Sequence, residues 1–179
     1  MPTPETIASI REFLINQGFV VHFAGDGESI TVHVPLKHVR ITFGFRILEE
    51  QGLLQIEGYL PVVVPEDKKL AAADFFNRIN WGLKRGRFVM DPSDGEVRFR
   101  QEFGHGSVSN SVDIAMLYLA NGGRMVDAFF PALTGVIFRD TSPEEALEQG
   151  TKEYELLSSE DSENRGAVNS WSCDALLYH

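Results

Sequence analysis

Residues 71–103 read AAADFFNRINWGLKRGRFVMDPSDGEVRFRQEF and carry the clearest structural pattern of the chain. The pattern predicts an amphipathic helix, a glycine stop, a strand, a tight turn and a second strand. We expect the helix to begin after Pro65, where Glu66 and Asp67 suit the helix dipole, and to end at Gly86. Its apolar side chains recur three and four residues apart and therefore share one face. They are Leu70, Ala73, Phe76, Ile79 and Leu83.

The two strands that follow, Arg87–Asp91 and Glu96–Phe103, flank the turn sequence DPSDG. Asp, Pro, Ser and Gly are the residues that tight turns favour. Apolar and charged side chains alternate along the second strand, which indicates one buried and one solvated sheet face. Val97, Phe99 and Phe103 are expected to point into the core, and Arg98, Arg100 and Glu102 to point away from it.

Two asparagines, Asn77 and Asn80, lie inside the predicted helix although asparagine is a poor helix former. They are either ligand contacts or structural residues whose amides satisfy backbone groups of the next hairpin. We favour the structural interpretation because no base or nucleophile stands near them in the sequence. It predicts that at least one of the two is substantially buried and bonded to backbone outside its own helix.

The chain before this stretch is predicted to form one helix, over residues 4–17, and two hairpins. The strands are 19–24 with 29–34, joined by GDGE, and 39–48 with 53–64, joined by EEQG. With the hairpin at 87–103 they predict an α+β fold: an antiparallel sheet of about five strands with helices packed mainly on one face. The core is expected to include Phe43, Ile56, Phe76, Ile79, Phe99 and Phe103.

The chain after this stretch is predicted to be helical. Apolar residues keep helical register from Val112 to Ile137. The sequence NGG at 121–123 and Pro131 interrupt that run, so we expect a kink or two helices rather than one rod. A further short helix is predicted after Thr141 or Ser142, because a proline and two glutamates follow.

The net charge of −10 lies mostly after residue 139. From Asp140 onward there are ten acidic and two basic side chains, a balance of −8, against −2 for the residues before it. A body so nearly neutral disfavours binding to nucleic acid. We predict one domain over 1–156, then an acidic linker and an apolar tail over 157–179. The tail carries Trp171, Leu176, Leu177 and Tyr178, which we expect to dock on an apolar face of the body or of a neighbouring copy; an unattached tail is the alternative.

The cellular location is expected to be the cytoplasm. The opening sequence MPTPETIASIREFLINQG has interspersed charges, unlike a secretory signal. The apolar run LPVVVP is too short to span a bilayer, so we expect no membrane role. Cys173 is the only cysteine, which excludes an internal disulfide and suits a reducing compartment.

Residues 7–147 resemble the YbjN-like family of bacterial proteins. The resemblance is carried by GYLPVVVPEDK, by FFNRINWGLKRGRFVMDPSDGEVRFRQEF, and by SVDIAMLYL leading to VDAFFPALTGVIF. Its most specific part is the pair Asn77 and Asn80, followed by Gly86-Arg87-Phe88 and an Asp-Gly turn. It implies a fold like that of the class I type III secretion chaperones and a role as a regulator of sensory transduction. It implies no catalytic residues.

The sequence itself indicates no catalytic, cofactor or metal site. Ser107, Ser109 and Ser111 beside His105 suit a loop and a helix cap rather than a nucleophile. A structural metal site needs several convergent ligands, and the histidines are scattered. They are His22, His33, His38, His105 and His179.

One basic patch is the candidate recognition site. It consists of Lys84, Arg85, Arg87, Arg98 and Arg100, and it suits an acidic partner or a phosphate if the fold brings these residues together. Solvated surface charge is the alternative interpretation. We predict a non-enzymatic protein-interaction module, a regulator or chaperone-like protein that forms a homodimer. The alternative is a small-ligand sensor with a pocket between helices and sheet.

Overall fold

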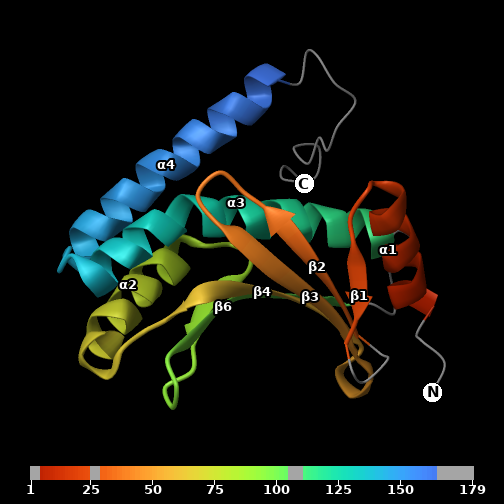
Figure 1. The fold of residues 1–179 in the computed structure, drawn as a ribbon, viewed down its shortest axis with the longest axis horizontal. Coiled ribbons are helices and arrows are strands. Elements are labelled where there is room, and N and C mark those ends of the chain that lie inside the picture. The colour runs from red at the N-terminus through yellow and green to blue at the C-terminus, as the bar shows by residue number, and fades with distance from the viewer. Residues whose placement is uncertain (1–4, 25–28, 105–110, 165–179) are drawn as a thin grey trace.

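A computed structural model describes residues 5–24, 29–104 and 111–164, with side chains to residue 160. Within these ranges the chain forms one six-stranded sheet and four α-helices (Figure 1). The predicted α+β class is confirmed. The tail residues Trp171, Leu176, Leu177 and Tyr178 lie outside the described ranges, as do His105, Ser107 and Ser109, whereas Ser111 is the first residue of a helix.

Every strand of the sheet pairs antiparallel to its neighbours, as predicted. The spatial order is β1-β2-β3-β4-β6-β5, which leaves β1 and β5 at the edges. The register between β4 and β6 shifts between Tyr59 and Val63. The strands are β1 (Val21–Phe23), β2 (Ser29–Pro35), β3 (Arg40–Leu48), β4 (Leu53–Val63), β5 (Arg87–Met90) and β6 (Glu96–Gly104).

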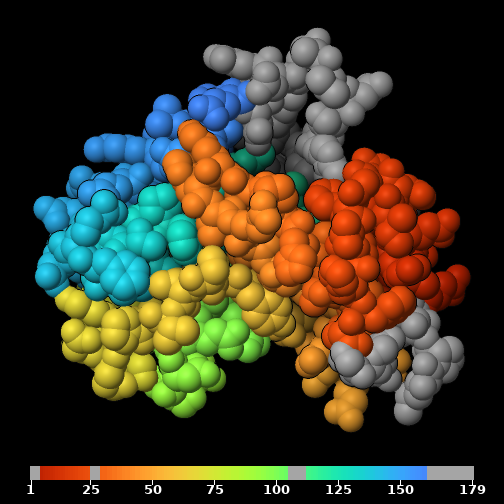
Figure 2. Space-filling model, in the orientation of Figure 1, coloured from red at the N-terminus to blue at the C-terminus, as the bar shows by residue number. Residues whose placement is uncertain are grey.

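The helices cover one face of this sheet. They are α1 (Glu5–Asn16), α2 (Lys69–Gly82), α3 (Ser111–Phe138) and α4 (Pro143–Asn164), with short 3-10 helices η1 (Glu49–Gln51) and η2 (Glu66–Lys68). Helix α3 runs along β4 and β6, α1 packs on α3 and on strands β1 to β3, and α4 lies on α2 and α3. Figure 2 shows α2 and α4 at one end of the molecule and α1 at the other.

Five of the six predicted core residues are buried: Phe43, Ile56, Phe76, Ile79 and Phe99. Phe103 is only half-buried and packs on Tyr118, with ring centroids 4.8 Å apart. The rings of Phe76 and Phe88 stack with centroids 5.8 Å apart, and Phe88 meets Phe99 edge-on at 4.8 Å. Helix α2 is therefore joined to the sheet through an aromatic cluster.

The predicted buried face of α2 is partly wrong. Leu70 is 85% exposed and Ala73 is also exposed. The η2 turn precedes the helix, so regular α-helix starts only at Lys69, and the side chains that face the core are Ala72, Phe75, Phe76 and Ile79. Gly86 does not stop the helix, which ends at Gly82. It has the predicted left-handed conformation (φ 73°), but at the entry to β5.

Helix α3 is continuous, so the alternative of two helices is wrong. A Cβ at Gly122 would lie 2.7 Å from Oε1 of Gln101, which shows that this glycine allows α3 to approach β6 closely. Helix α4 is also longer than the short helix predicted, because it continues to Asn164. Ser142 and Glu145 begin it with reciprocal side chain to backbone hydrogen bonds, as in a capping box.

Candidate functional site

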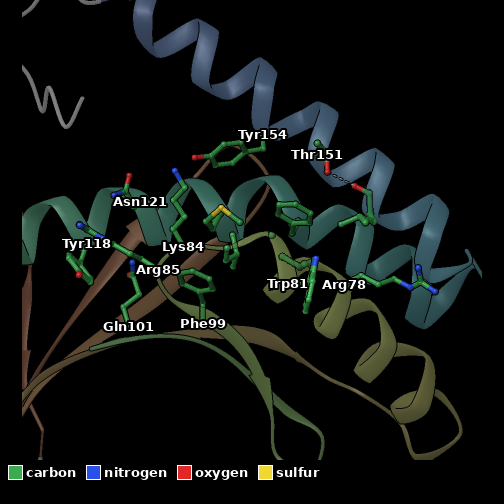
Figure 3. A pocket seen from close by; sticks show the side chains of 16 residues that line it. Arg78, Trp81, Lys84, Arg85, Phe99, Gln101, Tyr118, Asn121, Thr151 and Tyr154 are labelled. Atoms are coloured by element: carbon green, nitrogen blue, oxygen red, sulfur yellow. Dashed lines mark hydrogen bonds between the residues drawn. The ribbon is translucent and has the colours of Figure 1, made fainter. Parts of the chain in front are cut away.

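A pocket of about 650 Å³ lies between the helices and the core face of the sheet. Its walls come from the end of α2, the loop at 83–86, β6, α3 and α4 (Figure 3). The apolar part of the lining consists of Ile79, Leu83, Phe99, Met125, Phe129 and Leu147. The remaining lining side chains are Arg78, Trp81, Lys84, Arg85, Gln101, Tyr118, Asn121, Thr151 and Tyr154.

The loop that brings Lys84 and Arg85 to the pocket is fixed at both ends. Before it, the amide of Asn80 donates to the carbonyl of Phe88 and accepts from its N–H, both at 2.9 Å. Because β5 is an edge strand, this amide satisfies backbone groups that no further strand pairs with. After the loop, Gly86 packs so tightly that a Cβ would lie 2.6 Å from the Phe99 ring.

The two asparagines therefore differ. Asn80 is half-buried and bonded to backbone outside its helix, which is the arrangement that the structural interpretation predicts for one of the pair. Asn77 is exposed on the surface of α2. The amide of Asn80 acts on the pocket only indirectly, because it holds the loop in place.

Helix α4 closes the pocket from the side opposite the sheet. A Cβ at Gly150 would lie 2.3 Å from the Phe129 ring, so this glycine allows α4 to lie directly on α3. Farther along α4, Glu153 accepts hydrogen bonds from Nζ of Lys37 (3.1 Å) and contacts Nε2 of His38 (2.8 Å). These bonds hold the pKa of Glu153 below its usual value.

Asp127 of α3 fixes the turn that carries Lys37 and His38. Its buried carboxylate accepts the backbone N–H groups of both residues, at 3.1 and 2.7 Å. The turn between β2 and β3 is thereby bound to α3 and α4 at once. This polar junction adds to the packing of α4 on α2 and α3, and so helps to position one pocket wall.

Gln101 is the polar residue set deepest in the pocket wall. It is only 2% exposed, and Figure 3 shows it directed from β6 toward α3 beside Phe99. Its Oε1 is buried and has no hydrogen-bond partner among the residues described. An unsatisfied buried acceptor costs about 1–3 kcal/mol, so such a group in a folded protein needs an explanation.

All the charged side chains that line the pocket are basic: Arg78, Lys84 and Arg85. Arg78 is neutralised by Asp74 at 3.1 Å and by Glu144. Lys84 and Arg85 are exposed at the rim, and within the described ranges neither forms a salt bridge. The guanidinium of Arg85 lies 6.0 Å from the ring centroid of Tyr118, a cation–π distance.

The other three residues of the predicted basic patch lie on the outer face of the sheet. Their cations are all paired: Arg87 with Glu102 at 2.9 Å, Arg98 with Glu96 at 2.8 Å, and Arg100 with Glu57 at 2.7 Å. Alternation along β6 places Arg98 and Arg100 opposite to Phe99 and Gln101. The five predicted residues thus form two separate sets, and only Lys84 and Arg85 reach the pocket.

Tyr59 and Glu57 complete the charge network of the outer face. The Tyr59 ring lies under the Arg98 guanidinium at 4.9 Å, and its hydroxyl donates to Glu57 at 3.3 Å. Burial and the charge of Glu57 raise the pKa of Tyr59. This face is a set of mutually satisfied groups.

Sequence reasoning missed Gln101, Tyr118, Asn121 and Tyr154 as pocket residues. One signal was present for Gln101, because it is a polar residue at an inward position of the alternating strand, between Phe99 and Phe103. The others come from α3 and α4, and the sequence did not show which of their faces meets β6.

The described residues offer neither a metal site nor a helix able to span a membrane. No three His, Cys, Asp or Glu side chains there are grouped so as to hold a metal ion. None of the helices found there has the length and apolarity needed to cross a membrane.

The molecule is a two-layer α+β protein. An antiparallel sheet forms one layer, helices packed on one of its faces form the other, and the pocket lies between them. The chain belongs to the YbjN family, whose profile matches residues 6–134 and is described as "Putative bacterial sensory transduction regulator". No curated protein and no solved structure matches the chain, so the expected likeness to type III secretion chaperones stays a prediction. The matched range ends inside α3, and α4 lies beyond it.

Proposed function

We propose that this chain is a cytoplasmic, non-enzymatic regulator whose state is set by a small ligand bound in the pocket between helices and sheet. The observation that carries the proposal is the pocket itself, with apolar walls around a few convergent polar groups and the buried, unsatisfied amide oxygen of Gln101. Small-ligand sites have this composition and volumes of roughly 300–1,000 Å³. The family description, a regulator of sensory transduction, agrees with it.

The chemistry of the lining supports binding rather than catalysis. Among the described residues, the side chains that line the pocket include no carboxylate, imidazole or thiol. General bases and activated nucleophiles are most often drawn from these groups. The polar groups that are present are amides, phenols, a hydroxyl and three cations, and these suit recognition.

A bound ligand can change the arrangement of the helices and the sheet because it contacts several of them at once. A ligand in the pocket contacts the end of α2, β6 and α4 together, so it stabilises the arrangement in which these elements are joined. A ligand shifts a conformational equilibrium only by its difference in affinity for the two states. Helix α4, which a polar junction holds at Glu153, is the element whose position we expect the ligand to control.

Thermal shift measurements with a small-molecule library test the pocket. Thr151 lines the pocket from α4, whereas its neighbour Lys152 is exposed and does not line it. Ligands should raise the melting temperature of the wild type and of Lys152→Trp, because binding stabilises the native state by mass action. They should not raise that of Thr151→Trp, whose indole fills the pocket. Equal shifts in all three proteins, or no shift with any compound, would contradict the proposal.

Protein interaction is the second candidate function, and one observation favours it. Trp81 is 93% exposed at the rim of the pocket, and exposed tryptophans are frequent energetic centres of interfaces. The occupant we propose is a second copy of the chain, giving a homodimer. Sedimentation velocity should then show a wild-type dimer and a Trp81→Glu monomer. A wild-type monomer at micromolar concentration would rule it out.

A further inference from the structure

We infer that the ligand of this pocket is a small apolar acid, that is, an anionic head group on a hydrocarbon or aromatic body. The inference rests on the proposed function and adds the chemical class of the ligand. It comes from three observations: the sign of the charge at the pocket, the separation of polar and apolar groups along it, and the way the cations are held.

The charge of the pocket is opposite to that of the chain. The whole protein carries −10, yet the charged side chains of the lining are all basic. Arg78 among them is neutralised by Asp74 and Glu144, which leaves Lys84 and Arg85 as the attractive pair. A local positive potential on an acidic protein selects anions at that place and repels them elsewhere.

Polar and apolar groups occupy different ends of the pocket. A Cβ at Gly86 would lie 2.9 Å from the Cγ of Gln101, so this amide lies directly beside the loop that carries Lys84 and Arg85. Tyr118 lies near the Arg85 guanidinium, at 6.0 Å. Gly122 meets Oε1 of Gln101, which places Asn121 at the same end. A head group there would have two cations, two amides and a phenol around it.

The opposite end lies under α4 and is mainly apolar. Two polar side chains there already have partners: Arg78 pairs with Asp74 and Glu144, and the Thr151 hydroxyl donates to the carbonyl of Leu147. Phe129 meets Gly150 of α4 and the ring of Phe75, with centroids 6.4 Å apart, and Leu147 and Ile79 complete this part of the lining. These groups have no means of recognising a polar ligand. An apolar body here gains about 0.8 kcal/mol per buried CH₂. The pocket therefore suits an amphipathic molecule in one orientation only.

The loop that carries the two cations is held in place before any ligand arrives. Gly86 and the Asn80–Phe88 bonds fix the loop, so little backbone ordering remains to oppose binding. An arginine guanidinium also binds a carboxylate through two parallel hydrogen bonds, and a neighbouring lysine adds a third donor. The outer-face arginines offer no comparable site because carboxylates already pair with them.

Isothermal titration of the full chain with octanoate and with octan-1-ol tests this assignment. The two probes share an apolar body and differ in charge. We expect the wild type to bind octanoate at least about tenfold more tightly than octan-1-ol. In Lys84→Gln/Arg85→Gln, the octanoate affinity should fall about tenfold and the octan-1-ol affinity should stay unchanged. Chemical unfolding of the variant should match that of the wild type, since neither side chain is buried.

Each other outcome overturns the inference in a recognisable way. If octan-1-ol binds as tightly as octanoate and Thr151→Trp abolishes both, the pocket binds ligands but does not select acids. If neither probe binds, the inference is wrong, and the thermal shift measurements decide the proposed function separately. If Thr151→Trp binds both probes as the wild type does, they bind outside the pocket, and the inference is wrong.

Discussion

The two faces of the sheet carry the same kind of cation in opposite settings. On the outer face, Arg87, Arg98 and Arg100 each pair with a carboxylate, and Glu57 is nearly buried among them. On the helix-covered face, Lys84 and Arg85 stand at a pocket rim without a carboxylate partner in the described part of the chain. Charges that are satisfied within the fold hold it together, and charges that are not satisfied remain available for a ligand.

Gly86 should give the largest effect, because it keeps the pocket loop in place. Gly86→Ala combines a left-handed residue, at about 1–2 kcal/mol, with overpacking against Phe99 and Gln101, at about 1–3 kcal/mol. We expect the free energy of unfolding to fall by about 2–5 kcal/mol in urea titrations. Gly52→Ala is the matched control, because it has φ 63° and open space around it. Equal losses in both variants would show that the tight packing of Gly86 contributes nothing.

Asn80 should give the next largest effect. Asn80→Ala leaves the N–H and carbonyl of Phe88 without their side-chain partner, which costs about 1–3 kcal/mol. Asn77→Ala, on the exposed side of the same helix, should leave stability unchanged or slightly higher, since alanine is the better helix former. Urea unfolding of the two variants separates these results. A similar loss in both would remove the special role of Asn80.

Substitution of Glu57 tests whether the paired charges of the outer face stabilise the fold more than the charges at the pocket rim. Glu57→Gln weakens the bonds to Arg98, Arg100 and Tyr59, and we expect it to lower the free energy of unfolding by about 1–2 kcal/mol. Lys84→Gln/Arg85→Gln should change it by less than about 0.5 kcal/mol, as exposed unpaired charges do. The contrast between the faces is wrong if the pocket variant is the less stable one.

Glu153 should give the smallest effect, and it should depend on pH. Its folded-state pKa is lowered by its hydrogen bonds with His38 and Lys37, so its contribution is full above its ordinary pKa of 4.5. That contribution is lost as the pH falls through the folded-state value. At pH 7 the free energy of unfolding of the wild type should exceed that of Glu153→Gln by roughly 0.2–1 kcal/mol, as measured by urea titration. This difference should disappear in acid. A gap that widens on acidification would contradict the assignment.

The local pattern predicted most of the strands and helices because their causes are local. Turn sequences such as DPSDG and the alternation in Glu96–Phe103 act over a few residues, and all three predicted hairpins formed where they were expected. The roles of the glycines could not be read in this way. Gly86 and Gly122 were interpreted as helix breakers, yet both serve close approaches to β6 that exist only in the folded chain.

The pocket was less predictable than the fold because it is assembled from distant segments. Its lining runs from Arg78 to Tyr154 and joins four elements with a loop. The predicted basic patch contained the two cations that reach it but grouped them with three arginines of the opposite face. Whether a basic side chain is free to bind a ligand depends on whether a carboxylate lies beside it in the folded protein, as Glu57 lies beside Arg100. Proximity in the sequence does not show this.

The most direct test of the central claim is octanoate affinity in two variants with the same change in net charge. Lys84→Gln/Arg85→Gln and Arg87→Gln/Arg98→Gln each remove two positive charges, the first pair at the pocket and the second on the outer face. Isothermal titration should show about a tenfold loss of affinity for the pocket variant and wild-type affinity for the outer-face variant. Equal losses would mean that only the overall charge matters, which would contradict the assignment of the pocket as an acid-binding site.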